Sequence, residues 1–385
     1  MKLYEDNAEK YNSIPKEKFV LVQNEEKIHD AGFKTKPIGF FKDVMIRFTR
    51  NKASVCAAVI ILIIAFFALF GPGMNPYKFD EQHTDRTNMP PKIPAIANLD
   101  LGIFDGGFVM ENRQYDNISD TSKYPEGSIL EILNPRLVNG QKIVDVKVDY
   151  YKYVGMADDE CYWFGSDYLG RDIWTRMWRG ARVSLIIAIV SVFCNVTIGV
   201  VYGSISGYYG GKVDMVMMRI TEIINAFPRI VIVTLFIMVA GTGMFSIIMS
   251  LVIKDWVSTA RMVRSQFYRF KGREYVLAAR TLGVKDVALI FRHILPNSLG
   301  PIITSAMIAI PTAIFAESFL AYIGLGLQAP EPSIGVMLSQ GQKVLLQYPS
   351  QVVFPAITIS LLMISFNLFG DGLRDAFDPT LRGSE

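Results

Sequence analysis

The sequence predicts an all-α integral membrane protein with six transmembrane helices and a small β-containing insert between the first two helices. Hydrophobic residues make up 51% of the 385 residues and charged residues only 19%, against about 25% in an ordinary soluble domain. Apolar runs long enough to cross a bilayer recur along the chain, and one polar stretch separates the first run from the others. These observations indicate a chain that lies mainly within a membrane.

The first predicted span is Ala53–Gly71, which carries no charge and is close to the 20 or so residues that a hydrocarbon core requires. The preceding segment, 1–52, has no early apolar run. We therefore expect no cleaved signal peptide and a retained cytoplasmic N-terminal segment.

An insert, 72–162, follows the first span and is rich in proline, glycine and acidic residues. Within it, Val144–Tyr150 alternates apolar and charged residues, which is typical of a strand with one wet face. We expect a small β-containing subdomain outside the cytoplasm. An unstructured acidic loop is the alternative.

Five further spans are predicted in a transmembrane core, 183–373, followed by a cytoplasmic tail, 374–385. These spans are Val183–Tyr202, Ile220–Ala240, Met244–Met262, Ser298–Ile323 and Val352–Phe369. The segment 163–182 has Trp174 and Trp178 beside several arginines, a pattern typical of a helix lying along lipid headgroups. We predict an interfacial helix there.

Basic residues in short loops predict the orientation. They gather before the first span and again in the loop 263–297: Lys34, Lys36, Lys42, Arg47, Arg50 and Lys52, then Arg264, Arg269, Lys271, Arg273, Arg280, Lys285 and Arg292. Both regions are therefore expected in the cytoplasm, with both termini inside and the insert outside, in a multi-pass protein of the plasma membrane.

The sequence excludes several kinds of chemistry. It contains no phosphate-binding loop, nucleophile elbow, His-Glu-x-x-His or Cys-x-x-Cys, so we expect no catalytic residue, no metal site, no cofactor and no ATP hydrolysis on this chain. The net charge of +3 is too small to suggest nucleic acid as a partner.

The segment Glu274–Asn297 is a charged, helix-forming stretch between two apolar runs. Strong helix formers precede Gly283, which favours a helix end there, and a second short helix is predicted to stop at Pro296. The small side chains of Ala278 and Ala279 would let another surface approach closely. The segment is either such a docking hairpin or a structured linker between spans.

A resemblance favours the docking hairpin. The pattern Ala278-Ala279-x-x-x-Gly283, with Leu295-Pro296 further on, resembles the "EAA" loop of ABC importer permeases, although Leu277 and His293 depart from the usual residues. The stretches "WFGSDYLGRDIWTRMWRGARVSL", "GGKVDMVMMRITEIINAFP", "AESFLAYIGLGLQAPEPSIGVML" and "NLFGDGLRDAFDPTLR" resemble the second, "C"-type permease of the oligopeptide, dipeptide and nickel transport family.

This resemblance implies a type I importer permease fold and an assembly with a homologous second permease, two cytosolic ATP-binding subunits and an extracytoplasmic binding protein. It implies oligopeptides as substrate, with dipeptides or nickel chelates as alternatives. It also implies that one loop couples the chain to the ATPase through Ala278, Ala279, Arg280, Gly283, Asp286, Leu295 and Pro296.

Charges inside predicted spans each need a partner or a watery path, and three of them are singled out. Lys254 and Asp255 are adjacent, and Glu317 lies in the fifth span. They are candidates for lining a translocation path, with structural pairing to other helices as the alternative. A secondary transporter and a membrane-anchored receptor remain rival functions, but we see no inverted repeat, and a receptor would leave the hairpin unexplained.

Overall fold

The structure is a computed structural model and describes residues 39–97, 104–118, 120–157 and 160–377. Contacts divide the chain into two units, Met1–Asp43 and Val44–Glu385, and the account below concerns the second. Most of the predicted N-terminal segment, with Lys34 and Lys36, and most of the predicted tail lie outside the described residues.

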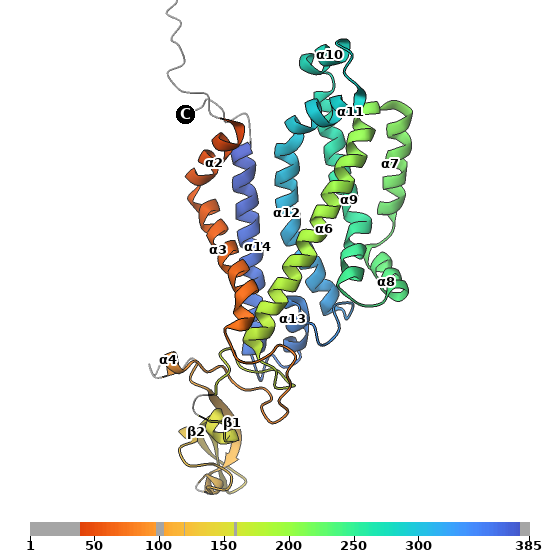
Figure 1. Cartoon of the computed structure of the whole chain (residues 1–385). Helices are drawn as coiled ribbons and strands as arrows, with labels where there is room; N and C mark the ends of the chain where they lie inside the picture. Colours follow the sequence, from red (N-terminus) through yellow and green to blue (C-terminus); the bar gives the residue numbers. More distant parts are fainter. Residues whose placement is uncertain (1–38, 98–103, 119, 158–159, 378–385) are drawn as a thin grey trace, which may run out of the picture. The chain divides into compact units, whose positions relative to one another are not determined.

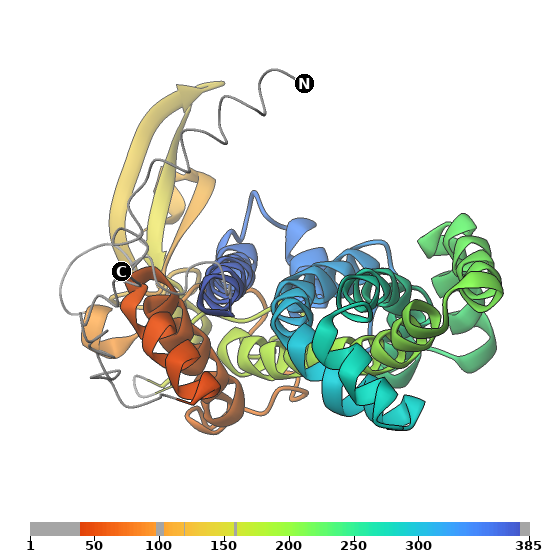
Figure 2. The same ribbon diagram turned by 90° about the horizontal axis from the view of Figure 1, so that it is seen from above.

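Most of the described chain after Val44 is helical. The longer helices are α2 (Phe40–Arg50), α3 (Lys52–Phe70), α6 (Ile173–Tyr209), α7 (Gly211–Ala226), α8 (Arg229–Ala240), α9 (Met244–Phe270), α12 (Leu295–Tyr322), α13 (Ile334–Gln342) and α14 (Ser350–Phe377). Helix α6 packs along α9 and crosses α12, and α3 packs along α14 (Figure 1). Viewed from above, α7 lies on the far side of α6 from α3 (Figure 2).

Helices α6 and α9 approach closely because α6 carries glycines at four-residue spacing, Gly199, Gly203 and Gly207. A Cβ atom on Gly203 would lie 2.3 Å from the carbonyl oxygen of Ala260, and one on Gly207 would lie 2.6 Å from the Cβ of Phe267. Small residues at such spacing are a common means of packing membrane helices backbone to backbone.

Five of the six predicted spans each fall on one helix, whereas Ile220–Ala240 falls across the break between α7 and α8, and not all of them have the composition of a span. Within the described chain, four helices are long and apolar enough to cross a membrane, and α7 with α8, bent by 82°, forms a fifth candidate. Helix α9 is equally long but carries Lys254, Asp255 and Arg261. The count of six therefore stays a prediction that depends on α9.

The structure differs from the interfacial helix predicted over 163–182. Helix α6 starts at Ile173 and continues without interruption to Tyr209. Arg171 and Arg176 are buried, and both form ion pairs with Asp167. Asp167 provides a shared counter-charge for the two buried arginines, and Arg176 also donates to the carbonyl oxygen of Phe79 at 3.1 Å.

The insert contains a three-stranded antiparallel sheet of β1 (Gly107–Gln114), β2 (Ile129–Val138) and β3 (Gln141–Asp149), with β3 in the centre. Asn139 and Gly140, which join β2 to β3, both have positive φ, as a two-residue hairpin turn requires. The predicted β-containing insert is confirmed, and the strand predicted over Val144–Tyr150 is β3.

The two faces of β3 are covered differently. Val144, Val146 and Val148 are fully buried in the insert's own core. On the other face, Asp145 accepts hydrogen bonds from the Asn112 amide N–H at 2.9 Å and from the Asn134 side chain at 3.1 Å. These bonds hold the pKa of the Asp145 carboxyl below its usual value. The face predicted to be wet is thus covered by polar side chains.

Side-chain contacts join the insert to the start of α14. The rings of Phe108 and Tyr348 stack with centroids 5.6 Å apart. The Gln351 side-chain amide donates to Oδ1 of Asn88 at 2.8 Å and to the carbonyl oxygen of Ser166 at 3.2 Å. The insert is therefore attached to the helical bundle through side chains as well as through the chain itself.

Candidate functional site

The hairpin, residues 274–297, projects beyond the end of α9 (Figure 1). It consists of α10 (Glu274–Thr281), α11 (Asp286–Ala288) and the π-helical turn η4 (Leu289–Ile294), which continues into α12. The predicted stop at Pro296 is wrong. Pro296 lies where the π-helical turn η4 passes into α12, and the helix continues through it to Tyr322.

One face of α10 packs onto the helical bundle. Val276 is fully buried and Ala279 is 8% exposed, in an apolar cluster that includes Val263 and Phe267 of α9. Ala278, its neighbour, is exposed, since consecutive helical residues point about 100° apart. The two predicted alanines therefore lie on different faces, one holding α10 in place and one facing outward.

Gly283 ends α10 in a left-handed conformation, with φ of +80°. Its N–H donates to the carbonyl oxygen of Arg280 at 3.0 Å, and the N–H of Val284 donates to that of Ala279 at 3.2 Å. This pair of bonds is the Schellman motif. No atom of the described residues lies within 4 Å of a Cβ placed on Gly283, so the backbone conformation, not lack of space, requires glycine.

Tyr208 of α6 joins the two arms of the hairpin. Arg280 on α10 donates to the Tyr208 hydroxyl at 3.1 Å, and that hydroxyl donates to the carboxylate of Asp286 at the start of α11. The structure thus brings together the predicted residues Arg280 and Asp286 through a third that the sequence reasoning missed. Leu295 and Pro296 lie at the base of the hairpin instead, at the start of α12.

The outer surface of the hairpin carries exposed apolar side chains among its charged ones. Four large side chains are exposed by 46% to 84% of their area: Leu277, Leu282, Val287 and Phe291. Sequence reasoning noted only Leu277, as a departure from a motif, although the periodicity of the other three could have shown that they do not face the bundle. Clustered apolar side chains of this kind are typical of a protein-docking surface.

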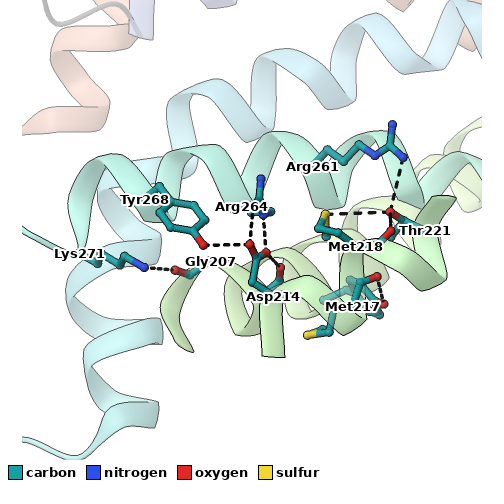
Figure 3. Close-up of polar contacts among 11 residues, drawn as sticks. Gly207, Asp214, Met217, Met218, Thr221, Arg261, Arg264, Tyr268 and Lys271 are labelled. Carbon is teal, nitrogen blue, oxygen red and sulfur yellow. Dashed lines mark hydrogen bonds and ion pairs between the residues drawn. The ribbon is translucent and has the colours of Figure 1, made fainter. Parts of the chain in front are cut away.

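A charged cluster at the same end fixes α6, α7 and α9 to one another. The Asp214 carboxylate on α7 accepts from Arg264 and Tyr268 of α9 and from Ser206 of α6. The side chains of Arg264 and Tyr268 point at Asp214 (Figure 3). Lys271, just after α9, donates to the Gly207 carbonyl oxygen at 2.9 Å. Movement of the α9 end would therefore be passed to α6 and α7.

Lys254 and Asp255 lie at the break between α7 and α8. The Lys254 ammonium donates to the carbonyl oxygens of Asn225 at 3.2 Å and of Phe227 at 2.6 Å, at the end of α7. Asp255 forms an ion pair with Arg229, the first residue of α8. The two adjacent charges thus hold opposite sides of the same break.

Glu317 lies elsewhere. It is fully buried, and its carboxylate accepts from the Ser184 hydroxyl of α6 at 2.9 Å. It lines none of the cavities that adjoin Lys254 and Asp255. Within the described residues, no group of three or more His, Cys, Asp or Glu side chains is placed to hold a metal ion.

Two family models match the chain. The binding-protein-dependent transport system inner membrane component matches residues 199–383. The N-terminal transmembrane domain of oligopeptide transport permease C matches residues 39–91. The first match includes the whole hairpin and the break between α7 and α8.

Bacterial proteins resemble the chain over most of its length. The oligopeptide transport system permease protein of Bacillus subtilis is 35% identical over 90% of this chain and 92% of its own. The dipeptide transport system permease protein of the same species is 34% identical over 98% and 97%. The glutathione transport system permease protein of Pectobacterium atrosepticum is 36% identical over 61% and 78%. Likeness of this extent shows that the chain belongs to the inner membrane permeases of binding-protein-dependent ABC transport systems, in the group of the oligopeptide and dipeptide permeases.

Proposed function

We propose that this permease forms, with a homologous second permease, the path by which an ABC importer carries peptides across the plasma membrane. Two cytosolic ATP-binding subunits hydrolyse the ATP, and an extracytoplasmic binding protein delivers the peptide. In this scheme the chain is the conduit, and alternating access is driven by its partners.

The observation that carries the proposal is the hairpin, which presents exposed apolar side chains while its inner face packs against the helical bundle. Its exposed side chains, Leu282 and Val287 above all, would be buried by a docked ATP-binding subunit. Val276, Ala279 and the capping bonds at Gly283 hold the surface in shape, so little conformational freedom is lost on docking.

Tyr208 supports a route for the movement. When the ATP-binding subunits close, they displace the hairpin, and Tyr208 passes that displacement to α6 through Arg280 and Asp286. Helix α6 packs along α9, so the two helices move together. The spans then rock between states open to either side.

The relatives favour peptides as substrate. The similar proteins named above are permeases for oligopeptides, dipeptides and glutathione, all of which contain peptide bonds. We propose oligopeptides first and dipeptides second, while these relatives give no support to nickel chelates. Lys254 contacts the end of α7 and Asp255 contacts the start of α8. These contacts at the helix break support placing both residues beside the path.

Association with the ATP-binding subunits tests the proposal. We expect purification from membranes in mild detergent to recover the permease with ATP-binding subunits. Leu282→Asp and Val287→Asp should each lower that recovery at least about tenfold, the loss typical of a central contact residue.

Leu137→Asp is the matched control, since Leu137 is 78% exposed on β2 of the insert. It should leave the recovery unchanged. Purification of the wild-type chain without any ATP-binding subunit would overturn the proposed function. Equal recovery with Leu282→Asp and Leu137→Asp would remove the hairpin as the docking surface.

A further inference from the structure

A cavity lined by both polar and apolar side chains lies next to the break between α7 and α8. It has a volume of about 310 Å³ and receives side chains from four helices, among them Asn195 of α6, Arg229 of α8, Asp255 and Ser258 of α9 and Ser305 of α12. A cavity of this size admits a small ligand. Asp255 is eleven residues into α9, about 17 Å along its axis, so the cavity lies near the middle of the length of α9.

Asn195, which lines the cavity, has a hydrogen-bond acceptor without a donor. Its side chain is only 7% exposed, and its Oδ1 has no hydrogen-bond partner among the described residues. A buried amide oxygen without a donor is costly. Oδ1 is itself closed off from the cavity's open space, so an N–H group there, such as that of a peptide bond, would satisfy it once the Asn195 side chain turns toward the cavity.

Arg229 supplies the positive charge. Its Nη2 reaches Asp255, and a guanidinium has five N–H donors, so donors remain for a second acceptor. The adjoining cavity of about 320 Å³ shares Arg229 and Asp255 and adds Lys254 and Arg261. Three cations and one carboxylate line it, an excess that favours an anionic ligand.

The cavity is not an isolated void. It shares Ser305 and Ile308 with a third cavity, of about 510 Å³, which reaches Arg269 at the end of α9 and Arg374 on α14. Irregular backbone at membrane depth is tolerated where it lines a watery space. The broken helix and the joined cavities are consistent with such a space along α9 and α12.

We propose that the cavity at Arg229 and Asn195 binds the carboxylate end of a short peptide in transit. Arg229 binds the terminal carboxylate, Asn195 accepts the hydrogen bond of the last peptide N–H, and Asp255 positions the guanidinium in the empty state. A peptide carboxylate suits the site because it presents an anion next to an amide. This inference rests on the proposed function and adds a binding residue on the permease itself.

The test uses the purified complex with its partner permease and ATP-binding subunits, without the binding protein. The probes are trialanine and its C-terminal amide, with binding measured by titration calorimetry. The wild type should bind trialanine at least about tenfold more tightly than the amide, because a charge-assisted hydrogen bond is lost with the carboxylate. Arg229→Gln should abolish this preference.

Arg219→Gln is the matched control, since Arg219 is exposed on α7 and pairs with Glu222. It should keep the preference. Asn195→Leu should weaken the binding of both probes without changing the ratio of their affinities. This variant takes the place of Arg229→Gln as the test if Arg229→Gln fails to assemble.

Equal binding of both probes by the wild type would overturn the inference, and so would a preference that survives Arg229→Gln. Recovery of a complex with ATP-binding subunits that binds neither probe would overturn this inference alone. Absence of ATP-binding subunits would overturn the proposed function and this inference with it.

Discussion

Single residues of the hairpin illustrate how sequence and structure divide the explanation. A helix end at Gly283 was predicted from residue type, and the structure confirms it with a positive φ and two capping bonds. The different roles of Ala278 and Ala279 depend on which face of α10 meets the bundle. That face is set by Val263 and Phe267 of α9, against which α10 packs after the chain turns back.

Two substitutions of Gly283 distinguish the effect of backbone strain from the effect of a long side chain that blocks docking. Arg at this φ should cost about 1–2 kcal/mol and place a long side chain in the open space beside the docking surface. We expect Gly283→Arg to insert normally but to lose the ATP-binding subunits or their coupled transport. Recovery of the complex and peptide uptake are the measurements.

Gly283→Asn is the control, because asparagine tolerates the left-handed conformation and is short. It should keep most of the uptake. Normal uptake with Gly283→Arg would show that nothing docks closely at this end of α10.

At the scale of elements, the close pair of α6 and α9 determines how the hairpin is connected to the membrane core. Gly199, Gly203 and Gly207 were visible in the sequence at four-residue spacing, but the sequence could not show that they face α9. The contacts with Ala260 and Phe267 show it. A side chain at any of these positions would hold the two helices apart.

Gly203→Leu should therefore destabilise the protein by at least about 2 kcal/mol, since an overpacked contact forces backbone to move. Thermal unfolding of the detergent-solubilised complex should show a lower Tm. Val201→Leu also enlarges an α6 side chain, but at a position 45% exposed, and should leave the Tm unchanged. Equal Tm values for both variants would contradict the close contact.

Turns and breaks between elements were the least predictable features. The alternation around Val144 was enough to predict β3, yet the Asn139-Gly140 turn, a strong hairpin signal, was not used to predict β2. Pro296 was interpreted as a helix stop, but the helix continues through it from η4 into α12. Local patterns specify an element more firmly than they specify its ends.

On the scale of the whole molecule, the basic residues in short loops predict the orientation of the chain. The hairpin and the insert should then face opposite sides of the membrane. Helix α9 decides the parity of the spans, because its charges make it the least apolar of the six candidates.

Cysteine labelling in a variant lacking Cys56, Cys161 and Cys194 tests this arrangement. Leu137→Cys, in the insert, should react with a membrane-impermeant maleimide in intact cells. Leu282→Cys, in the hairpin, should react only after the membrane is opened. Both side chains are largely exposed in the permease itself, and the labelling uses the permease expressed without its ATP-binding subunits, so access and not burial determines the result. Labelling of both from the same side would contradict a six-span orientation.

The sequence alone determined the membrane class, the approximate helices, the β-containing insert and the hairpin, because apolar periodicity and glycine or proline chemistry act over a few residues. Only the tertiary structure decided that Tyr208 bridges Arg280 and Asp286, that Lys254 and Asp255 hold the two sides of one helix break, and that Asn195 and Arg229 line one cavity. These relations join residues far apart in the chain, and they depend on which helix faces pack together. A single sequence does not encode that choice locally.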